Sequence, residues 1–376
     1  MPIAIQPYRA EHEPAVAAFN QRLRSAGQDE NLVFYRSSVA RWLPRTETSK
    51  LHNELFVAVD NSSGSLVVRG GYALKTQDFL FPDRQIRSIG YYHHPLSEGL
   101  IDKSQAIVGT LLLRDAMQRA PLLYCLGMNG YDNPLPQMLI RMGWNHFAVP
   151  FLFRALRPAR FLRNMETIRS SAIRRALLDA VALSGAGSMA SGIFQSYQAL
   201  TNRAPAATFE EVLGFGETSE SIWAQAKNSC SFTAVRDSEA LRQLYPPSET
   251  HLRRIIVKVG GEPVGWAVVG ERREDSKYGA MRVASVVDCF ATSGHYLSVV
   301  RCATEALAGK DFDLILTNQS HQDWVKAFRA AGYLPGPSNF IFAASKKLGE
   351  LLAPFAETRP RMHMNRSDGD GLPKNY

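Results

Sequence analysis

The feature that most constrains the fold of this chain is an internal repeat of predicted elements. Each half contains a hairpin of two strands, a third strand, a helix, a fourth strand, a short helix and a closing strand. Alternating apolar residues predict the strands, and apolar residues three or four positions apart predict the helices. Self-similarity over a domain-sized period restricts the chain to two similar domains in tandem.

In the first half, a strand and a helix precede the hairpin. The predicted elements are IAIQPYR (3–9), EHEPAVAAFNQRLRS (11–25), ELFVAVD (54–60), SLVVRGGYAL (65–74), IRSIGYY (86–92), a helix over 103–120, LLYCLG (122–127), PLPQMLIRMGW (134–144) and HFAVPFLF (146–153). The second half gives RRIIVKV (253–259), EPVGWAVVGE (262–271), MRVASVVDCF (281–290), a helix over 293–310, FDLILTN (312–318), HQDWVKAFRAAGY (321–333) and NFIFAAS (339–345). Two local matches fix the alignment, Gly71-Tyr72 with Gly265-Trp266 and Gly143-Trp144 with Gly332-Tyr333.

These patterns divide the 376 residues into four parts. We predict a first α/β domain over 1–153, a helical connector rich in arginine over 154–204 and a second α/β domain over 205–347. Residues 348–376 are polar and lack an apolar period, which predicts a disordered tail.

The composition is that of a globular chain, 45% hydrophobic and 21% charged. We expect a cytoplasmic protein, because no signal peptide is recognisable at the start and the four cysteines form no CxxC pair. No metal is expected, because histidines and cysteines lack ligand spacing. The net charge is +8, and seven arginines stand between Arg154 and Arg175 with Glu166 as the only acid. This stretch is either a solvated helix face or an anion-binding surface, on which Arg160, Arg163 and Arg169 are the candidates.

The order of elements resembles the GNAT (GCN5-related N-acetyltransferase) acyltransferase fold, and the duplication resembles tandem GNAT and FemAB-like proteins. The resemblance covers about 1–153 and, less fully, 205–345. It implies mixed sheets, with acetyl-CoA or another acyl-CoA bound where two parallel strands separate. It also implies a loop of small residues at the start of the next helix, where free N–H groups hold the pyrophosphate.

The loop at that place in the first half is Lys103-Ser104-Gln105-Ala106-Ile-Val108-Gly109. The resemblance puts Lys103, Ser104, Gln105, Ala106 and Gly109 against the cofactor, while Val108 departs from the expected glycine. The second half has Ala291-Thr-Ser-Gly-His295 instead, so we expect it not to bind CoA in the usual way. Tyr91 and Tyr92 at the end of the third strand, and Asn129 and Asn133 after the fourth, complete the cofactor candidates, although Asn-Gly and Asn-Pro are also ordinary turn dipeptides.

Transfer of an acyl group to an amine needs a base near neutral pKa, and His93 and His94 follow the third strand directly. Glu98 is predicted to orient one of them or to act as the base through water. The alternative is that one histidine packs in the core and the other lies at the surface. The tyrosine acid of the family is missing, because Leu139 and Phe328 stand at its two places, and nothing selects Tyr124 or Tyr131 as a substitute.

Three functions remain open. The first is transfer of an acyl group from acyl-CoA to an amine of a small molecule or cell-envelope precursor. The second is a FemAB-like transferase that uses aminoacyl-tRNA, in which the arginines would contact nucleic acid or a membrane surface. The third is a catalytically degenerate fold that binds a ligand or partner.

Overall fold

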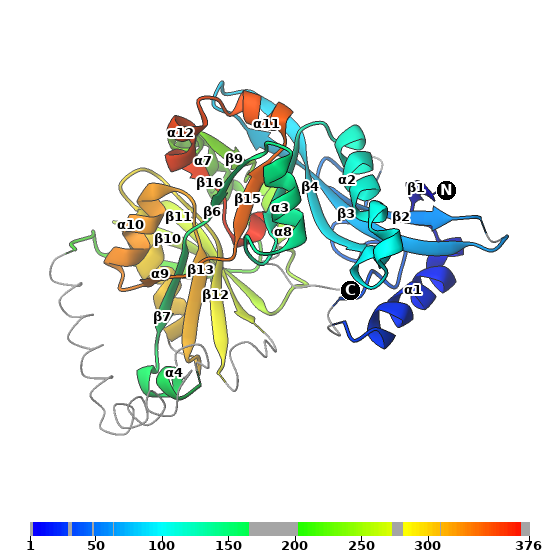
Figure 1. Ribbon diagram of the computed structural model, residues 1–376. Coiled ribbons are helices and arrows are strands. Elements are labelled where there is room, and N and C mark those ends of the chain that lie inside the picture. Colours follow the sequence, from blue (N-terminus) through cyan, green and yellow to red (C-terminus); the bar gives the residue numbers. More distant parts are fainter. Residues whose placement is uncertain are drawn as a thin grey trace. The chain divides into compact units, whose positions relative to one another are not determined.

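The computed structural model describes residues 3–28, 32–46, 49–62, 64–164, 202–272, 281–308 and 310–369. The chain divides into two compact units (Figure 1). Unit 1 consists of Met1–Ala148 and Ile341–Phe355, and unit 2 consists of Val149–Phe340 and Ala356–Gly371. Each unit contains a mixed sheet, which confirms the predicted α/β class.

Unit 1 contains a sheet with the strand order β1-β2-β3-β4-β5-β15-β6, in which the β4–β5 pair is parallel. Its strands are β1 (Ile3–Pro7), β2 (His52–Asp60), β3 (Val67–Leu80), β4 (Ile86–Ser97), β5 (Leu123–Gly127), β6 (Asn145–Ala148) and β15 (Ile341–Ala344). Its helices are α1 (Glu13–Ser25), α2 (Ile107–Arg119), α3 (Pro134–Arg141) and α11 (Lys346–Leu351). Along the chain, the helices and strands from β1 to β6 follow one another in the order predicted for the first half.

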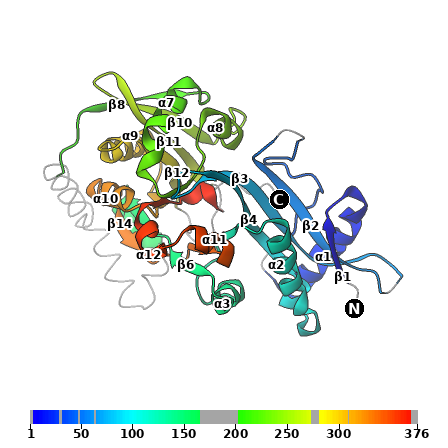
Figure 2. The same cartoon turned by 90° about the horizontal axis from the view of Figure 1, so that it is seen from above.

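Side chains of neighbouring strand residues point to opposite faces of this sheet and build two cores. Phe56 and Leu74 lie with Leu112 of α2 in one apolar cluster. Val57 and Ala73 lie with α1 in the other. The two helices therefore cover opposite faces of the sheet, as Figures 1 and 2 show.

Unit 2 repeats the arrangement with the strand order β14-β7-β13-β12-β11-β10-β8, in which the β12–β13 pair is parallel. Its strands are β7 (Phe151–Ala155), β8 (Ala207–Val212), β10 (Leu252–Val259), β11 (Glu262–Arg272), β12 (Val283–Ala291), β13 (Leu314–Asn318) and β14 (Leu334–Gly336), and β9 (Phe232–Ala234) pairs with β16 (Met362–His363). Its helices are α4 (Pro158–Asn164), α7 (Glu217–Ala226), α8 (Ser238–Leu244), α9 (Tyr296–Ala308) and α10 (Gln322–Ala330); α12 (Phe355–Thr358) lies at the boundary of the units.

The closing strands differ from the prediction. The stretch predicted as one strand over 146–153 breaks at Val149-Pro150, so β6 belongs to unit 1 and β7 to unit 2. Proline cannot donate to a strand ladder, and its carbonyl instead accepts a hydrogen bond from Gln319 N at 3.0 Å. The strand predicted to close the second half, β15, lies in the sheet of unit 1. The units are therefore discontinuous in sequence, unlike the contiguous 1–153 and 205–347.

Two predictions for the remaining segments have different outcomes. The prediction of a disordered tail over 348–376 is wrong up to Gly369, because Met362–Asp368 is structured and buried in unit 2. Of the connector predicted over 154–204, Arg154 belongs to β7 and α4 is helical, whereas residues 165–201 lie outside the described part of the chain.

Candidate functional site

The parallel strands of unit 1 separate after a short ladder. β4 and β5 pair at Gly90 with Leu123 and at Tyr91 with Tyr124, and within the described residues 86–127 no further pair joins them. The Tyr91 hydroxyl donates to the carbonyl oxygen of Leu126 at 2.8 Å, so a side chain bridges the strands where the backbone pairing ends. We call the region between the carboxyl-terminal parts of β4 and β5 the first cleft; the name marks where the backbone ladder ends, and the side chains of Tyr91, Tyr92 and Leu126 there are buried.

Backbone in the left-handed region is concentrated at the carboxyl ends of these two strands. β4 has one residue more than β3 between their paired positions, and His94 in this bulge has φ +50°. Directly after β5, Met128 has φ +62° and Asn129 has φ +55°, between Gly127 and Gly130, whose φ is also positive. This conformation is uncommon for residues other than glycine, and strained backbone is often found at functional sites.

The loop after β4 leads to a helix start that faces solvent. Two 3-10 turns, Glu98–Leu100 and Lys103–Gln105, precede α2. Lys103, Ser104 and Ala106 are exposed, and no side chain caps α2 at Ala106. Val108, which departs from the family pattern, is fully buried in the α2 core and therefore does not block the loop. The first N–H groups of α2 thus remain available to an anion.

Charges of both signs lie around this loop. Hydrogen bonds from Ser104 hold the pKa of Asp102 below its ordinary value, so one negative charge sits at the turn. Lys103 and Arg69 supply positive charges. A Cβ added to Gly109 would meet only Ser97 Oγ within 4 Å, at 3.6 Å, so the backbone there is not crowded.

Glu98 is held by arginines and not by a histidine. Its Oε1 accepts from Arg22 Nε at 2.6 Å and its Oε2 from Arg69 Nη1 at 2.8 Å. Its backbone carbonyl accepts from the N–H groups of Ile101 and Asp102 at 3.0 and 2.9 Å. The hypothesis that Glu98 orients a histidine is therefore wrong. These contacts instead fix the start of the loop between β4 and α2.

The two histidines have different surroundings. His93 is buried, with Nε2 3.1 Å from Asn53 Oδ1, and His94 is half-buried, with Nε2 2.7 Å from the carbonyl oxygen of Val33. Asn53 donates its amide to the carbonyl of Trp42, so its Oδ1 faces His93. Both Nε2 atoms therefore act as donors. Their role as base stays a prediction.

Of the other cofactor candidates, Tyr92 points away from the first cleft. It packs in the α2 core against Tyr72, and burial raises its pKa well above the ordinary value, so it stays protonated. Asn129 is exposed and Asn133 donates its amide to the Asn129 carbonyl at 2.9 Å, which stabilises the turn after β5. Tyr124 is fully buried and stacks on Tyr91 with ring centroids 5.0 Å apart.

Sequence reasoning missed a buried lysine near the first cleft, and it named Tyr131 without a reason to select it. Lys75 of β3 is 1% exposed, and its ammonium lies 5.5 Å from the ring centroid of Tyr91. The exposed Tyr131 has its hydroxyl 3.3 Å from His146 Nδ1. Only the cross-strand pairing of Lys75 with Tyr91, which no local pattern reveals, could have placed the lysine here.

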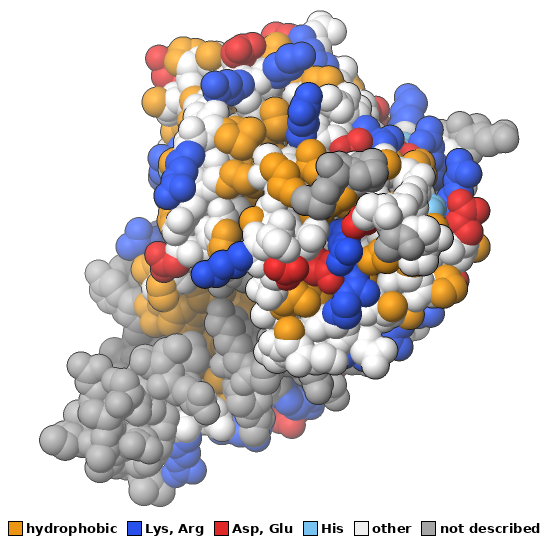
Figure 3. Space-filling model, turned by 45° about the vertical axis from the view of Figure 1, so that its right-hand side comes forward, with side chains coloured by type: hydrophobic (Ala, Val, Ile, Leu, Met, Phe, Trp, Pro, Cys, Tyr) orange, Lys and Arg blue, Asp and Glu red, His pale blue; other side chains and the backbone are white. Residues whose placement is uncertain are grey.

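The arginine-rich stretch is partly neutralised within unit 2. Arg160 Nη1 lies 3.1 Å from the buried carboxylate of Asp313, whereas Arg163 is exposed. Arg169 lies outside the described residues. On the face drawn in Figure 3, Lys and Arg side chains are spread among acidic and apolar ones and do not form one patch.

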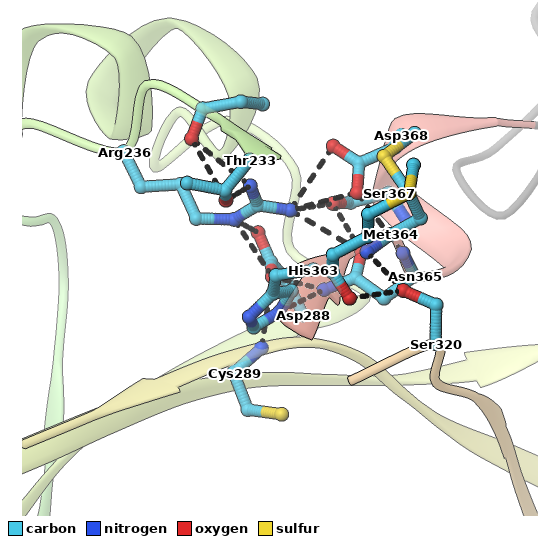
Figure 4. Close-up of polar contacts among 12 residues, drawn as sticks. Thr233, Arg236, Asp288, Cys289, Ser320, His363, Met364, Asn365, Ser367 and Asp368 are labelled. Carbon is cyan, nitrogen blue, oxygen red and sulfur yellow. Dashed lines mark hydrogen bonds and ion pairs between the residues drawn. The ribbon is translucent and has the colours of Figure 1, made fainter. Parts of the chain in front are cut away.

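The parallel strands of unit 2 also separate, but the chain itself fills the space. The β12–β13 ladder ends at Ser285 paired with Leu316. Beyond it lies a buried cluster of Arg236, Asp288 and Asp368 (Figure 4). We call this region the second cleft.

The described residues contain neither a candidate metal site nor a helix that could span a membrane. No three histidine, cysteine or carboxylate side chains gather there as metal ligands would, and none of the described helices is long and apolar enough to cross a membrane.

Comparisons with known proteins find remote likenesses to solved structures. No protein-family model and no curated protein matches the sequence. Among solved structures, a protein of unknown function from Enterococcus faecalis V583, described as a probable N-acyltransferase, is 8% identical with a TM-score of 0.48, covering 91% of this chain and 72% of its own. The Saccharomyces cerevisiae N-myristoyltransferase with bound myristoyl-CoA is 8% identical with a TM-score of 0.47, covering 91% and 82%.

A tandem GNAT protein from the clavulanic acid biosynthesis pathway is 11% identical with a TM-score of 0.46, covering 91% of this chain and 98% of its own. These TM-scores lie below 0.5, so the likenesses do not establish what this chain does. By the order and pairing of its own elements, the chain has a tandem GNAT-like layout.

Proposed function

We propose that the chain is an N-acyltransferase that binds an acyl-CoA in the first cleft and transfers the acyl group to an amine. The observation that carries this proposal is the separation of β4 and β5 beside the uncapped, solvent-facing start of α2. Separated strands offer backbone groups to an extended amide-containing arm, and a helix start favours its phosphates. Glu98, with Arg22 and Arg69, positions the loop between them.

The reaction requires proton transfers that histidines can provide. The amine nitrogen attacks the thioester carbonyl, the new C–N bond forms and the C–S bond breaks. His93 or His94 takes the proton that the amine loses, and the departing thiolate takes up a proton.

One observation favours a second candidate, binding of an acyl-CoA without transfer. Leu139 and Phe328, at the two places of the family's tyrosine acid, are both fully buried in apolar clusters. An aminoacyl-tRNA-dependent reaction gains no comparable support, because Arg160 is engaged by Asp313. A cytoplasmic location belongs to the proposal, since acyl-CoA is an intracellular donor and the four cysteines are buried thiols that form no disulfide.

Thermal unfolding with and without acetyl-CoA, and with longer acyl-CoAs, tests the donor. Ligand at 100 times its Kd stabilises the folded state by about 2.7 kcal/mol. No shift with any of these thioesters contradicts the proposal. A shift without acyl transfer to any amine in a panel of small amines and envelope precursors favours the second candidate.

A matched pair of variants tests the place of binding. Ala106→Asp puts a negative charge at the start of α2, which the helix tolerates but a pyrophosphate does not, so Kd should rise by about tenfold or more. Ser293→Asp makes the same change at the exposed turn before α9 in unit 2 and should leave Kd unchanged. Equal losses in both variants would overturn the assignment to unit 1.

A further inference from the structure

The segment from Met362 to Asp368 is one of the most buried parts of unit 2, although its composition is polar. His363 and Asn365 are 0% exposed, and Arg366, the most accessible residue of the segment, is 9% exposed. A polar segment is buried at such depth only where its groups find partners. The partners therefore reveal what the segment does.

The segment occupies the second cleft and is bonded to both of its strands. On the β13 side, Ser320 N donates to the Met364 carbonyl at 3.0 Å, and Arg366 Nη1 donates to Asn318 Oδ1 at 2.8 Å. On the β12 side, Asn365 Nδ2 donates to Asp288 Oδ1 at 2.5 Å. The segment thus takes the place between the separated strands that the first cleft leaves to a ligand.

Arg236 fastens the end of the segment to the strand. Its Nε donates to Asp288 at 3.0 and 3.1 Å, its Nη2 to Asp368 at 2.9 and 3.0 Å, and its Nη1 to Thr233 Oγ1 and the Ala234 carbonyl at 3.1 Å (Figure 4). Burial alone would lower the pKa of Arg236, but the carboxylates of Asp288 and Asp368 raise it above the ordinary value. One planar guanidinium therefore bridges a strand residue and a tail residue, which an ammonium cannot do in the same way.

Not every polar atom at the buried segment has a hydrogen-bond partner in the described structure. His363 Nδ1 and Gln319 Oε1 are buried and have no hydrogen-bond partner in the described structure. Each such atom costs part of the free energy gained by burial. The ion pair of Arg236 with Asp368 joins the end of the segment to a cation that is also bound to β12, so it is the contact that we test.

We propose that the second cleft is a peptide-binding site whose ligand is the chain's own segment Met362–Asp368, anchored by the Asp368 carboxylate on Arg236. The segment closes unit 2 to an acyl-CoA, which leaves one donor cleft per chain. This last consequence rests on the proposed function, whereas the anchoring does not.

Hydrogen exchange of the full chain, followed by mass spectrometry, tests the anchoring. In Asp368→Ala, Arg236 keeps its bonds to Asp288, Thr233 and Ala234, so no buried charge is left unpaired. Amides of 362–366 should exchange about tenfold faster or more, while those of β12, β13 and β15 stay near wild type. Arg236→Lys should act in the same direction, because lysine lacks the fork that reaches both carboxylates. Asp83→Ala, which removes an exposed partner of Arg87 in unit 1, is the matched control.

Unchanged exchange in 362–366 in both variants would overturn the anchoring, and so would equal acceleration throughout β12 and β13, since the segment would then open only with the whole unit. Calorimetric titration with acetyl-CoA separately tests whether the segment closes unit 2 to an acyl-CoA. One site per wild-type chain is expected, and two sites would overturn the closure of unit 2. No binding at all would contradict the proposed function and leave the exchange result to decide the anchoring.

Discussion

The first and second clefts start from the same layout and end with different contents. In both, a parallel pair separates after a short ladder, at Tyr91 with Tyr124 in unit 1 and at Ser285 with Leu316 in unit 2. The first cleft has a solvent-facing helix start beside it, whereas the second holds a buried arginine and a segment of the chain. The fold supplies a gap between strands, and the side chains around it decide whether that gap is a site or part of the core.

Removing the buried arginine should give the largest difference between the units. Arg236→Met leaves Asp288 and Asp368 buried without their cation, which typically costs about 3–5 kcal/mol. In unit 1, Arg69→Met leaves Glu98 with Arg22 and should cost about 1 kcal/mol, because Arg69 is 25% exposed. Denaturant unfolding monitored by exchange in β12 and in β4 measures both losses. Equal losses would contradict the view that only unit 2 depends on a buried charge cluster.

A smaller effect is expected from neutralising the carboxylate that holds the loop between β4 and α2. Glu98→Gln weakens the bonds from Arg22 and Arg69, so the loop before α2 becomes less ordered and the Kd for acetyl-CoA should rise about fivefold, or about 1 kcal/mol. Isothermal titration measures the change. A role in stability alone would lower the unfolding temperature and leave Kd as it was. The isosteric Asp83→Asn, at an exposed ion pair of the same unit, controls for loss of charge.

Much of the framework of both units is local in sequence and could be predicted. The hairpins, the helix after each third strand and the glycines that end α3 and α10 are fixed by apolar spacing and turn residues, and they are found where expected. Gly143 and Gly332 have φ +77° and +84°, which few other residues adopt. Local spacing placed Lys103 within the predicted helix over 103–120, whereas α2 begins at Ile107; only the resemblance placed Lys103 in a loop at the helix start.

Contacts between residues far apart in the sequence could not be predicted from local patterns. HFAVPFLF alternates like one strand, and only the partners of β6 and β7 show that Val149-Pro150 divides it between two sheets. The tail was expected to be disordered from its polarity, yet Arg236, more than a hundred residues away, supplies the charge that permits burial. Glu98 was expected near a histidine because they are neighbours in sequence, but the arginines that hold it come from α1 and β3.

The smallest expected difference between the units is in pH dependence. Burial lowers the pKa of His321 and of His363, which both lie in unit 2. Burial, followed by the charge of Arg236 and the proximity of His321, holds the pKa of His363 well below its ordinary value.

Below pH about 6.5, the unfolded chain therefore binds a proton at His363 that the folded chain does not. The contribution of His363 to the free energy of unfolding is complete above that pH. It decreases as the pH falls, by at most about 1.4 kcal/mol per pH unit. Denaturant unfolding of unit 2 between pH 7 and 5.5 should show this slope, and His363→Gln should reduce it. His295→Gln, at the turn before α9, should leave the slope unchanged. The same slope in the His363 variant would contradict this assignment and would leave His321, whose pKa is also lowered, as the source of the slope.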